Sequence, residues 1–287
     1  MKQLYLGVDT SNYKTSAALY CPEDGSFRQY GRLLEVPKGS LGLRQSDALF
    51  QHIRQLPEQV KDACAAMEGK IAGVGYSDRP RDLPDSYMPC FLAGQCAAVC
   101  MAAALGVSAG AFSHQQGHLA AAAFSVGKTE LLKAPFLAWH LSGGTTELLL
   151  VQPDEKRIIR ADIIGGSTDI SAGQLIDRAG VAMGLQFPAG VYVEQAALQS
   201  DSREWFPVKV QDCRFSFSGV QNQYEARLKA GEEQNAVCRF VLQTVAHTIL
   251  KATRQARKQY PGLPVLISGG VSVCSLVQEC FAMEKDV

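Results

Sequence analysis

Two short stretches of the sequence decide the fold. The first is LYLGVDTSNYKTSAALY, residues 4–20, in which an apolar run leads into a hydroxyl-rich turn and then into a second apolar run. The second is FLAWHLSGGTTELLLV, residues 136–151, which repeats this order about 130 residues further on. Short apolar runs on either side of a turn of small residues are typical of a β-hairpin. The repeat of this unit predicts a duplicated fold.

The segments outside the two hairpins support the duplication. In the first half we expect strands over 25–34 and 71–76 and helices over 48–67 and 91–105. In the second half we expect strands over 157–164 and 264–267 and helices over 171–183, 189–198 and 235–259. This alternation predicts an α/β fold of two lobes with mixed sheets. We expect the lobes to comprise residues 1–112 and 113–287.

Composition narrows the class of protein. The chain has 287 residues, of which 47% are hydrophobic, so it can bury a substantial core. With 28 basic and 28 acidic residues the net charge is zero, and a polyanionic partner must be bound by local groups. Secretory and membrane-spanning patterns are missing from the sequence, and the nine cysteines form no Cys-x-x-Cys pair. We therefore expect a cytoplasmic protein with reduced, buried thiols and no membrane contact.

The strongest chemical signal is SHQQGHLA, residues 113–120, at the head of an expected helix. Its two histidines, His114 and His118, are four residues apart. On a helix this spacing puts both imidazoles on one face, with their Cβ atoms about 5–6 Å apart. Two such imidazoles can bind one metal ion and form half of a metal site. Ordinary packing or surface polarity is the alternative interpretation of such a pair.

Glycine-rich turns form the second signal. SGGTT, residues 142–146, is the turn of the second hairpin, and SGGVS, residues 268–272, follows an expected buried strand. Glycines let the backbone come close to an anion, and backbone N–H groups at such turns bind phosphate. Ligands commonly lie at the ends of strands in α/β sheets. Together the turns indicate a nucleotide site in the cleft expected between the lobes.

The order of these motifs resembles one family, the TsaD-type tRNA threonylcarbamoyladenosine synthases, once called O-sialoglycoprotein endopeptidases. The resemblance covers nearly the whole chain, through residues 7–11, 113–118, 141–148, 173–177, 187–190, 215–220 and 268–272. It implies a two-lobed fold of the actin/hexokinase/Hsp70 (ASKHA) type. It also implies a transferase that moves a threonylcarbamoyl group from its adenylate to N6 of adenosine 37 of tRNA.

The resemblance also assigns ligands. It implies a divalent metal, iron or zinc, on His114 and His118, and ATP or threonylcarbamoyl-adenylate as the nucleotide, with Asp177 on the ribose. The expected partners are tRNA and a TsaB-like subunit, or a second copy of the chain, bound through the first lobe. Catalytic residues stay unassigned. The positions that match the family's nucleotide-binding places are Ser142, Gly143, Gly144, Thr145, Asp177, Gly190, Glu194, Gly269, Gly270 and Cys274.

Several family positions carry other residues here. Tyr13 and Lys14 replace an acidic pair in the first turn, Gln116 replaces an acid between the histidines, and Thr145 replaces a histidine. The sequence also stops before the family's Thr-Asp-Asn motif, which supplies a third metal ligand. Two hypotheses therefore stay open: an active transferase, or a non-catalytic paralogue that pairs with a true synthase subunit. Peptidase activity is disfavoured, because the His-Glu-x-x-His general base is missing.

Cations for tRNA contact are scattered in the sequence. They occur near the FSFSG segment, residues 215–219, which itself reads as an amphipathic strand and turn. Contact with RNA and a solvated basic face are both open interpretations of these cations. They are Arg203, Lys209, Arg214, Arg227 and Lys229.

Overall fold

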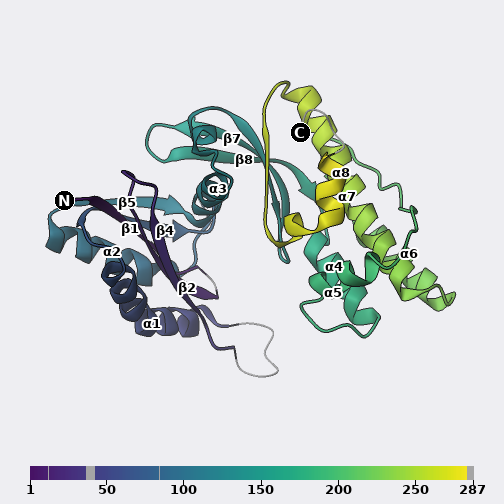
Figure 1. Cartoon of the computed structure of the whole chain (residues 1–287), viewed down its shortest axis with the longest axis horizontal. Helices are drawn as coiled ribbons and strands as arrows, with labels where there is room; N and C mark the ends of the chain where they lie inside the picture. Colours follow the sequence, from purple (N-terminus) through teal and green to yellow (C-terminus); the bar gives the residue numbers. More distant parts are fainter. Residues whose placement is uncertain (12, 37–42, 84, 283–287) are drawn as a thin grey trace. The chain divides into compact units, whose positions relative to one another are not determined.

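The computed structural model describes residues 1–11, 13–36, 43–83 and 85–282 (Figure 1). The chain forms two compact units, Met1–Ala121 with Glu155–Arg157, and Ala122–Asp154 with Ile158–Val287. The first unit includes the histidine pair, which the boundary expected from the sequence assigned to the second lobe. The physical reason is local. Strand β5 (Ser108–Ser113) leads directly into helix α3 (His114–Ser125), and the Gln115 N–H donates to the Pro80 carbonyl at 3.0 Å.

The first unit is built on a five-stranded sheet with the order β3-β2-β1-β4-β5. Strands β1 (Gln3–Asp9), β2 (Lys14–Tyr20) and β3 (Phe27–Leu33) are antiparallel neighbours. Strands β4 (Lys70–Arg79) and β5 run parallel to β1. Helices α1 (Gln45–Ala65) and α2 (Phe91–Leu105) pack together on this sheet. Alternate residues of β1, namely Leu4, Leu6 and Val8, point into the resulting core.

The second unit repeats this plan with the order β10-β6-β7-β8-β9. Strands β6 (Phe136–Leu141), β7 (Thr146–Asp154) and β8 (Ile158–Ser167) are antiparallel neighbours. Strand β10 (Val265–Ser268) lies parallel to β6, as β4 lies parallel to β1. The short strand β9 (Arg214–Phe215) pairs with β8. The duplication expected from the two hairpins is confirmed.

Five α-helices of the described residues build the core of the second unit. The longest, α7 (Gln234–Gln259), packs against α5 (Gly190–Ala197) and α8 (Ser275–Ala282). Helices α4 (Ala172–Ala182) and α6 (Ser218–Lys229) also pack on α7. Short 3₁₀ segments are η1 (Thr129–Lys133) and η2 (Gly270–Val273). The fully buried Trp139 of β6 lies at the centre of this core.

Two expectations about environment can be compared with the structure. Among the helices of the described ranges, none has the length and apolar character needed to cross a membrane. All nine cysteines are free, but Cys96 and Cys100 of α2 are exposed. The expectation of buried thiols is therefore wrong for these two residues, because they lie on the face of α2 that turns away from the sheet core.

A buried hydrogen bond ties β6 to α7. The Trp139 Nε1–H donates to Thr253 Oγ1 at 2.8 Å, and both side chains are fully buried. We expect Thr253→Val to lower the free energy of unfolding by about 1–3 kcal/mol. Valine keeps the volume of the threonine side chain, but the buried indole N–H of Trp139 loses its acceptor. Thr248→Val is the control, since the Thr248 hydroxyl donates only to the Thr244 carbonyl of the same helix. Urea unfolding followed by circular dichroism measures both, and equal losses would contradict this account.

Candidate functional site

The histidine pair lies in the first turns of α3, and a capping box fixes where that helix begins. The Gln116 N–H donates to Ser113 Oγ at 3.2 Å, while the Ser113 N–H donates to Gln116 Oε1 at 2.6 Å. This reciprocal arrangement satisfies backbone donors that a helix start leaves unpaired. Gln116 therefore has a structural role here. The cap makes His114 the first helical residue and places His118 one turn later on the same face.

The two imidazoles face each other through the same ring nitrogen. His118 Nε2 lies 2.8 Å from His114 Nε2, and the ring planes are 82° apart. On its other edge, His114 Nδ1 lies 3.1 Å from Asp9 Oδ2. Because an ionised carboxylate only accepts hydrogen bonds, His114 donates Nδ1–H to Asp9, and in the neutral ring the lone pair is then on Nε2. Asp9, His114 and His118 thus form one hydrogen-bonded chain.

Asp9 was missed as a site residue by the sequence analysis. It ends β1, and Ser113 ends β5; both strands flank β4 and run parallel, so their carboxyl ends meet at one edge of the sheet. Burial raises the pKa of Asp9, but the hydrogen bond and charge of His114, with the hydroxyl of Ser11, hold the pKa below its usual value. The carboxylate is therefore ionised beside the imidazole. An acidic residue at the end of a strand next to the hairpin turn was the available signal.

The pair can be tested for its fit to a metal ion. Tetrahedral zinc with Zn–N distances of 2.0–2.1 Å separates two nitrogen ligands by about 3.3 Å. The observed separation of 2.8 Å is close enough for a small ring movement to admit an ion. In the described part of the chain, no group of three His, Cys, Asp or Glu side chains is placed to hold a metal. The residues present therefore fit a site with two metal ligands, His114 and His118. Asp9 is an outer carboxylate, since it binds the far edge of His114.

In the second unit, the Ser-Gly-Gly turn rests on the start of α4. The Ser171 side chain caps α4 by accepting from the Gln174 N–H, and its hydroxyl donates to the Gly143 carbonyl at 2.6 Å. The Gly173 N–H donates to the Ser142 carbonyl at 3.3 Å. Within the turn, the Thr145 N–H donates to Ser142 Oγ at 3.1 Å. The turn is therefore held by a helix start that the sequence analysis placed within one residue.

The glycines of this region fall into two groups. A Cβ atom on Gly173 would lie 2.6 Å from the Ser142 carbonyl oxygen, and one on Gly269 would lie 2.2 Å from that of Leu141. These two glycines let three backbone segments meet around residues 141–143. Among the described residues, and apart from the adjoining backbone, a Cβ atom on any of the other four expected glycines would meet no atom within 4 Å; these are Gly143, Gly144, Gly190 and Gly270. Packing does not require these four glycines, so the space beside them is open.

Three other expected site residues have defined contacts within the fold. Asp177 Oδ1 accepts from the Ala189 N–H at 2.7 Å and so fixes the residue before α5. Glu194 Oε1 accepts from both the N–H and the hydroxyl of Ser275, at the start of α8. Cys274 is buried, and burial raises the pKa of its thiol. These contacts fix the elements that surround the glycine turns.

A second carboxylate, also missed by the sequence analysis, holds the FSFSG segment. Asp169 accepts from the N–H groups of Phe217 at 2.8 Å and Ser218 at 3.2 Å, and from the hydroxyl of Ser216. Partial burial raises the pKa of Asp169, but these hydrogen bonds hold it well below its usual range. The segment contains the expected strand and turn and also the start of a helix. Strand β9 ends at Phe215, and α6 starts at Ser218.

Solved structures identify the class of this fold. Full-length HypF, crystallised in a phosphate- and nucleotide-bound form, superimposes with a TM-score of 0.62 at 13% identity, over 98% of this chain and 51% of that one. Component A of (R)-2-hydroxyglutaryl-CoA dehydratase from Acidaminococcus fermentans gives 0.53 at 11% identity, over 98% and 88% of the two chains. The fold is thus the two-lobed, actin-like α/β class expected from the sequence.

Sequence comparison then gives the family. The profile of the TsaD family, tRNA N6-adenosine threonylcarbamoyltransferase, matches residues 50–286, and the chain belongs to this family. A protein of that name from Streptococcus pneumoniae (strain Taiwan19F-14) is 28% identical over 99% of this chain and 85% of its own length. Another, from Streptococcus equi subsp. zooepidemicus (strain MGCS10565), is 34% identical over 60% of this chain. That match spans about half of the relative's length, 51%.

The two groups of glycines make opposite predictions. We expect Gly173→Ala and Gly269→Ala each to lower the free energy of unfolding by about 1–3 kcal/mol, because the new methyl group would press on backbone atoms. Gly269 also has φ of +98°, which alanine rarely adopts. Gly143→Ala and Gly270→Ala should stay within about 0.5 kcal/mol of the parent chain. Urea unfolding compares the four variants, and similar stability in all of them would contradict the assignment.

Proposed function

We propose that this protein transfers a threonylcarbamoyl group from its adenylate to N6 of adenosine 37 of tRNA. In this reaction N6 attacks the carbamoyl carbon, a C–N bond forms, the bond from that carbon to the phosphate oxygen breaks, and AMP and a proton leave. The observation that carries the proposal is the Asp9–His114–His118 chain, found in a member of the TsaD family. The free thiols and the family suggest a cytoplasmic protein.

The second unit offers the nucleotide site of this proposal. The open space beside Gly143, Gly144 and Gly270 lets a phosphate approach backbone N–H groups without meeting side chains. Thr145 and Ser142 close the same turn, and Gly190 starts α5 next to the residue bound by Asp177. In the described residues, the hydrogen bond of Asp177 is made by Oδ1, and Oδ2 is left to accept from a ribose hydroxyl. The ligand is ATP or threonylcarbamoyl-adenylate.

The first unit offers the metal site. His114 and His118 would bind iron or zinc through their Nε2 atoms, and a bound metal would polarise a phosphoryl or carbonyl oxygen. Asp9 holds the Nδ1–H of His114, so that Nε2 of this ring faces His118 as an acceptor. Lys14 takes no part in the hydrogen bonds of Asp9, His114 and His118, because its side chain lies across Gly31 of β3. The carboxylate beside the imidazole is supplied by Asp9 although the family's acidic pair is replaced.

Metal-dependent nucleotide binding tests this function. We expect ATP binding in calorimetry to be weak in chelator-stripped protein and to return after reloading with zinc or ferrous iron. His114→Ala/His118→Ala should abolish the return. Asp9→Asn should weaken metal binding about 10–100-fold, since it removes the outer carboxylate and keeps its size. A transfer assay with transcribed tRNA and threonylcarbamoyl-adenylate follows, and absence of ATP binding in every state would overturn the enzyme proposal.

A second function, pairing with a true synthase subunit, is favoured by the outer face of α2. The helix contains no charged residue, and Leu92 and Val99 on its outer side are 42% and 45% exposed. Cys96 and Ala103 are also exposed and complete a stripe with 4-3-4 spacing along one helix face. Such uncharged helix faces are typical of protein contacts. The proposed occupant is a TsaB-like subunit or a second copy of this chain.

Association through α2 gives a direct measurement. We expect Val99→Asp to prevent complex formation in sedimentation velocity, both with a TsaB-like protein and in the chain alone, because it buries a charge in the contact. Val126→Asp is the control, since Val126 is 57% exposed and lies outside α2. Unchanged association of Val99→Asp would exclude α2 as the contact. Association combined with no ATP binding would favour the paralogue over the enzyme.

A further inference from the structure

An extended segment lies along helix α7. Residues 201–210, which we call the strap, contain no helix or strand. Its carbonyl groups accept hydrogen bonds from side chains of α7: Arg239 and Gln243 donate to the Ser202 carbonyl, Lys251 to that of Val208 and Gln255 to that of Val210. These four residues and His247 recur at every fourth position of α7, so they form one row on the helix. The strap is therefore held along most of its length.

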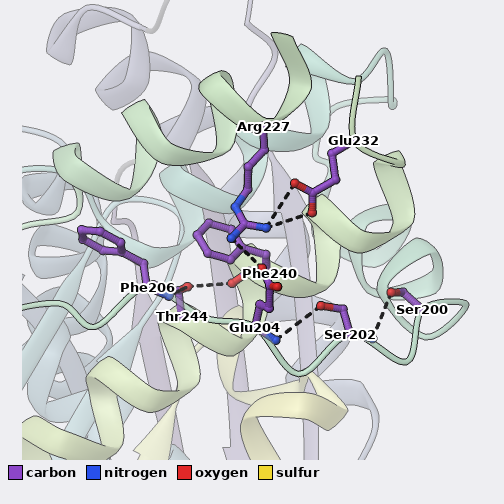
Figure 2. A network of polar contacts seen from close by, with 8 residues as sticks. All are labelled: Ser200, Ser202, Glu204, Phe206, Arg227, Glu232, Phe240 and Thr244. Atoms are coloured by element: carbon purple, nitrogen blue, oxygen red, sulfur yellow. Dashed lines mark hydrogen bonds and ion pairs between the residues drawn. The ribbon is translucent and has the colours of Figure 1, made fainter. Parts of the chain in front are cut away.

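Figure 2 shows how the start of the strap is fixed. Arg227 of α6 binds Glu204 of the strap at 2.7 Å and Glu232 at 2.9 Å, and its guanidinium lies over the Phe240 ring at 4.0 Å. The Phe206 N–H donates to Thr244 Oγ1 at 2.9 Å. Arg227, one of the cations considered for tRNA contact, is thus engaged in holding the strap, and Glu204 is neutralised by it.

The fixed strap presents an aromatic ring and cations to the outside. Val208 and Val210 are buried in the core, so the intervening Lys209 points outward. Trp205 is 40% exposed, and its indole stacks on the His247 ring with a centroid distance of 4.5 Å and an angle of 22°. The indole is therefore supported at the surface by α7, whose side chains also bind the strap.

Cationic side chains follow His247 along α7. His247, Lys251, Arg254 and Lys258 follow a 4-3-4 spacing, which gives a stripe about 16 Å long on one helix face. Lys251, Arg254 and Lys258 are exposed. The sequence from Gln234 to Gln278 contains no Asp or Glu, although the whole chain has equal numbers of acidic and basic residues. The acids of the strap and its end are Asp201, Glu204 and Asp212, of which Glu204 is paired with Arg227.

We propose that this surface, formed by Trp205, Lys209, Lys251, Arg254 and Lys258, binds an unpaired segment of RNA. The cations contact phosphates, and the fixed indole stacks on a base; proteins that bind single-stranded nucleic acid combine these two features. An anionic membrane would attract the cations, but the apolar face of α7 that could enter lipid is buried in the core. The inference rests on the proposed function, because tRNA is the RNA that such an enzyme must hold.

Fluorescence anisotropy with a labelled, transcribed tRNA tests the surface without turnover. We compare the full chain with Lys209→Gln/Arg254→Gln/Lys258→Gln, which spares Lys251 because that side chain holds the strap. We expect at least about tenfold weaker binding and a salt slope reduced by about 2–3, the amount for three lost phosphate contacts. Trp205→Ala should weaken binding several-fold with an unchanged salt slope, and Trp205→Phe should restore most of the loss.

The control is Lys61→Gln/Lys70→Gln/Lys133→Gln, which removes the same charge from exposed positions elsewhere. Equal weakening by this control would overturn the proposal, because net charge alone would then explain the binding. The proposal would also be overturned if the chain binds anionic lipid vesicles and Lys209→Gln/Arg254→Gln/Lys258→Gln loses that binding while its tRNA binding is unchanged. If the chain binds tRNA through this surface yet transfers nothing, the proposed function fails and the surface stands. If transfer occurs and the triple variant keeps its tRNA affinity, the surface fails alone.

Discussion

The second unit depends on a backbone contact that leaves no room for a side chain. Gly173 and Gly269 bring the start of α4 and the end of β10 onto the carbonyl groups of Ser142 and Leu141. Because these segments meet directly, the Ser-Gly-Gly turn, the capped helix start and the Gly269–Gly270 turn are held at one place. Strand β10 must pair with β6 for Gly269 to reach Leu141, and Ser268 Oγ strengthens this pair by donating to the Trp139 carbonyl.

The first unit reaches its site by a different constraint, the parallel alignment of β1, β4 and β5. Parallel strands end at the same sheet edge, so Asp9 and His114 are neighbours although they are 105 residues apart. The capping box then fixes the helix phase that turns His118 toward His114. Both units thus use the ends of strands and the starts of helices, where backbone N–H groups and polar side chains are left available by regular structure.

The sequence predicted the parts of this molecule whose signals are local. Both hairpins, the helix over 91–105 and the glycine turns were found because apolar period and turn residues lie within one segment. Strand β5, SAGAFS, was missed because its small residues resemble a loop, and α6 was missed because its polar composition gives no clear apolar face. Asp9 and Asp169 were missed for another reason: their partners, His114 and the FSFSG segment, are brought to them only by the sheets. The expected buried environment of Cys96 and Cys100 failed because composition does not reveal which face of α2 is covered.

The distribution of contacts also bears on how this chain would recognise an adenylate. Several expected ligand residues are used within the fold. One oxygen of Asp177 holds the residue before α5, Glu194 Oε1 holds the start of α8, and the Cys274 side chain is buried. The groups left for a ligand are mainly backbone N–H groups beside open glycines, together with hydroxyls of the Ser-Gly-Gly turn. Backbone donors bind phosphate by charge and geometry and carry little information about a base. The proposed site therefore favours the phosphate end of the nucleotide. The proposed RNA surface on the strap and α7 works in the same way, because phosphate contacts and stacking on Trp205 accept any base, so it adds affinity for RNA and not selectivity for the acceptor adenosine.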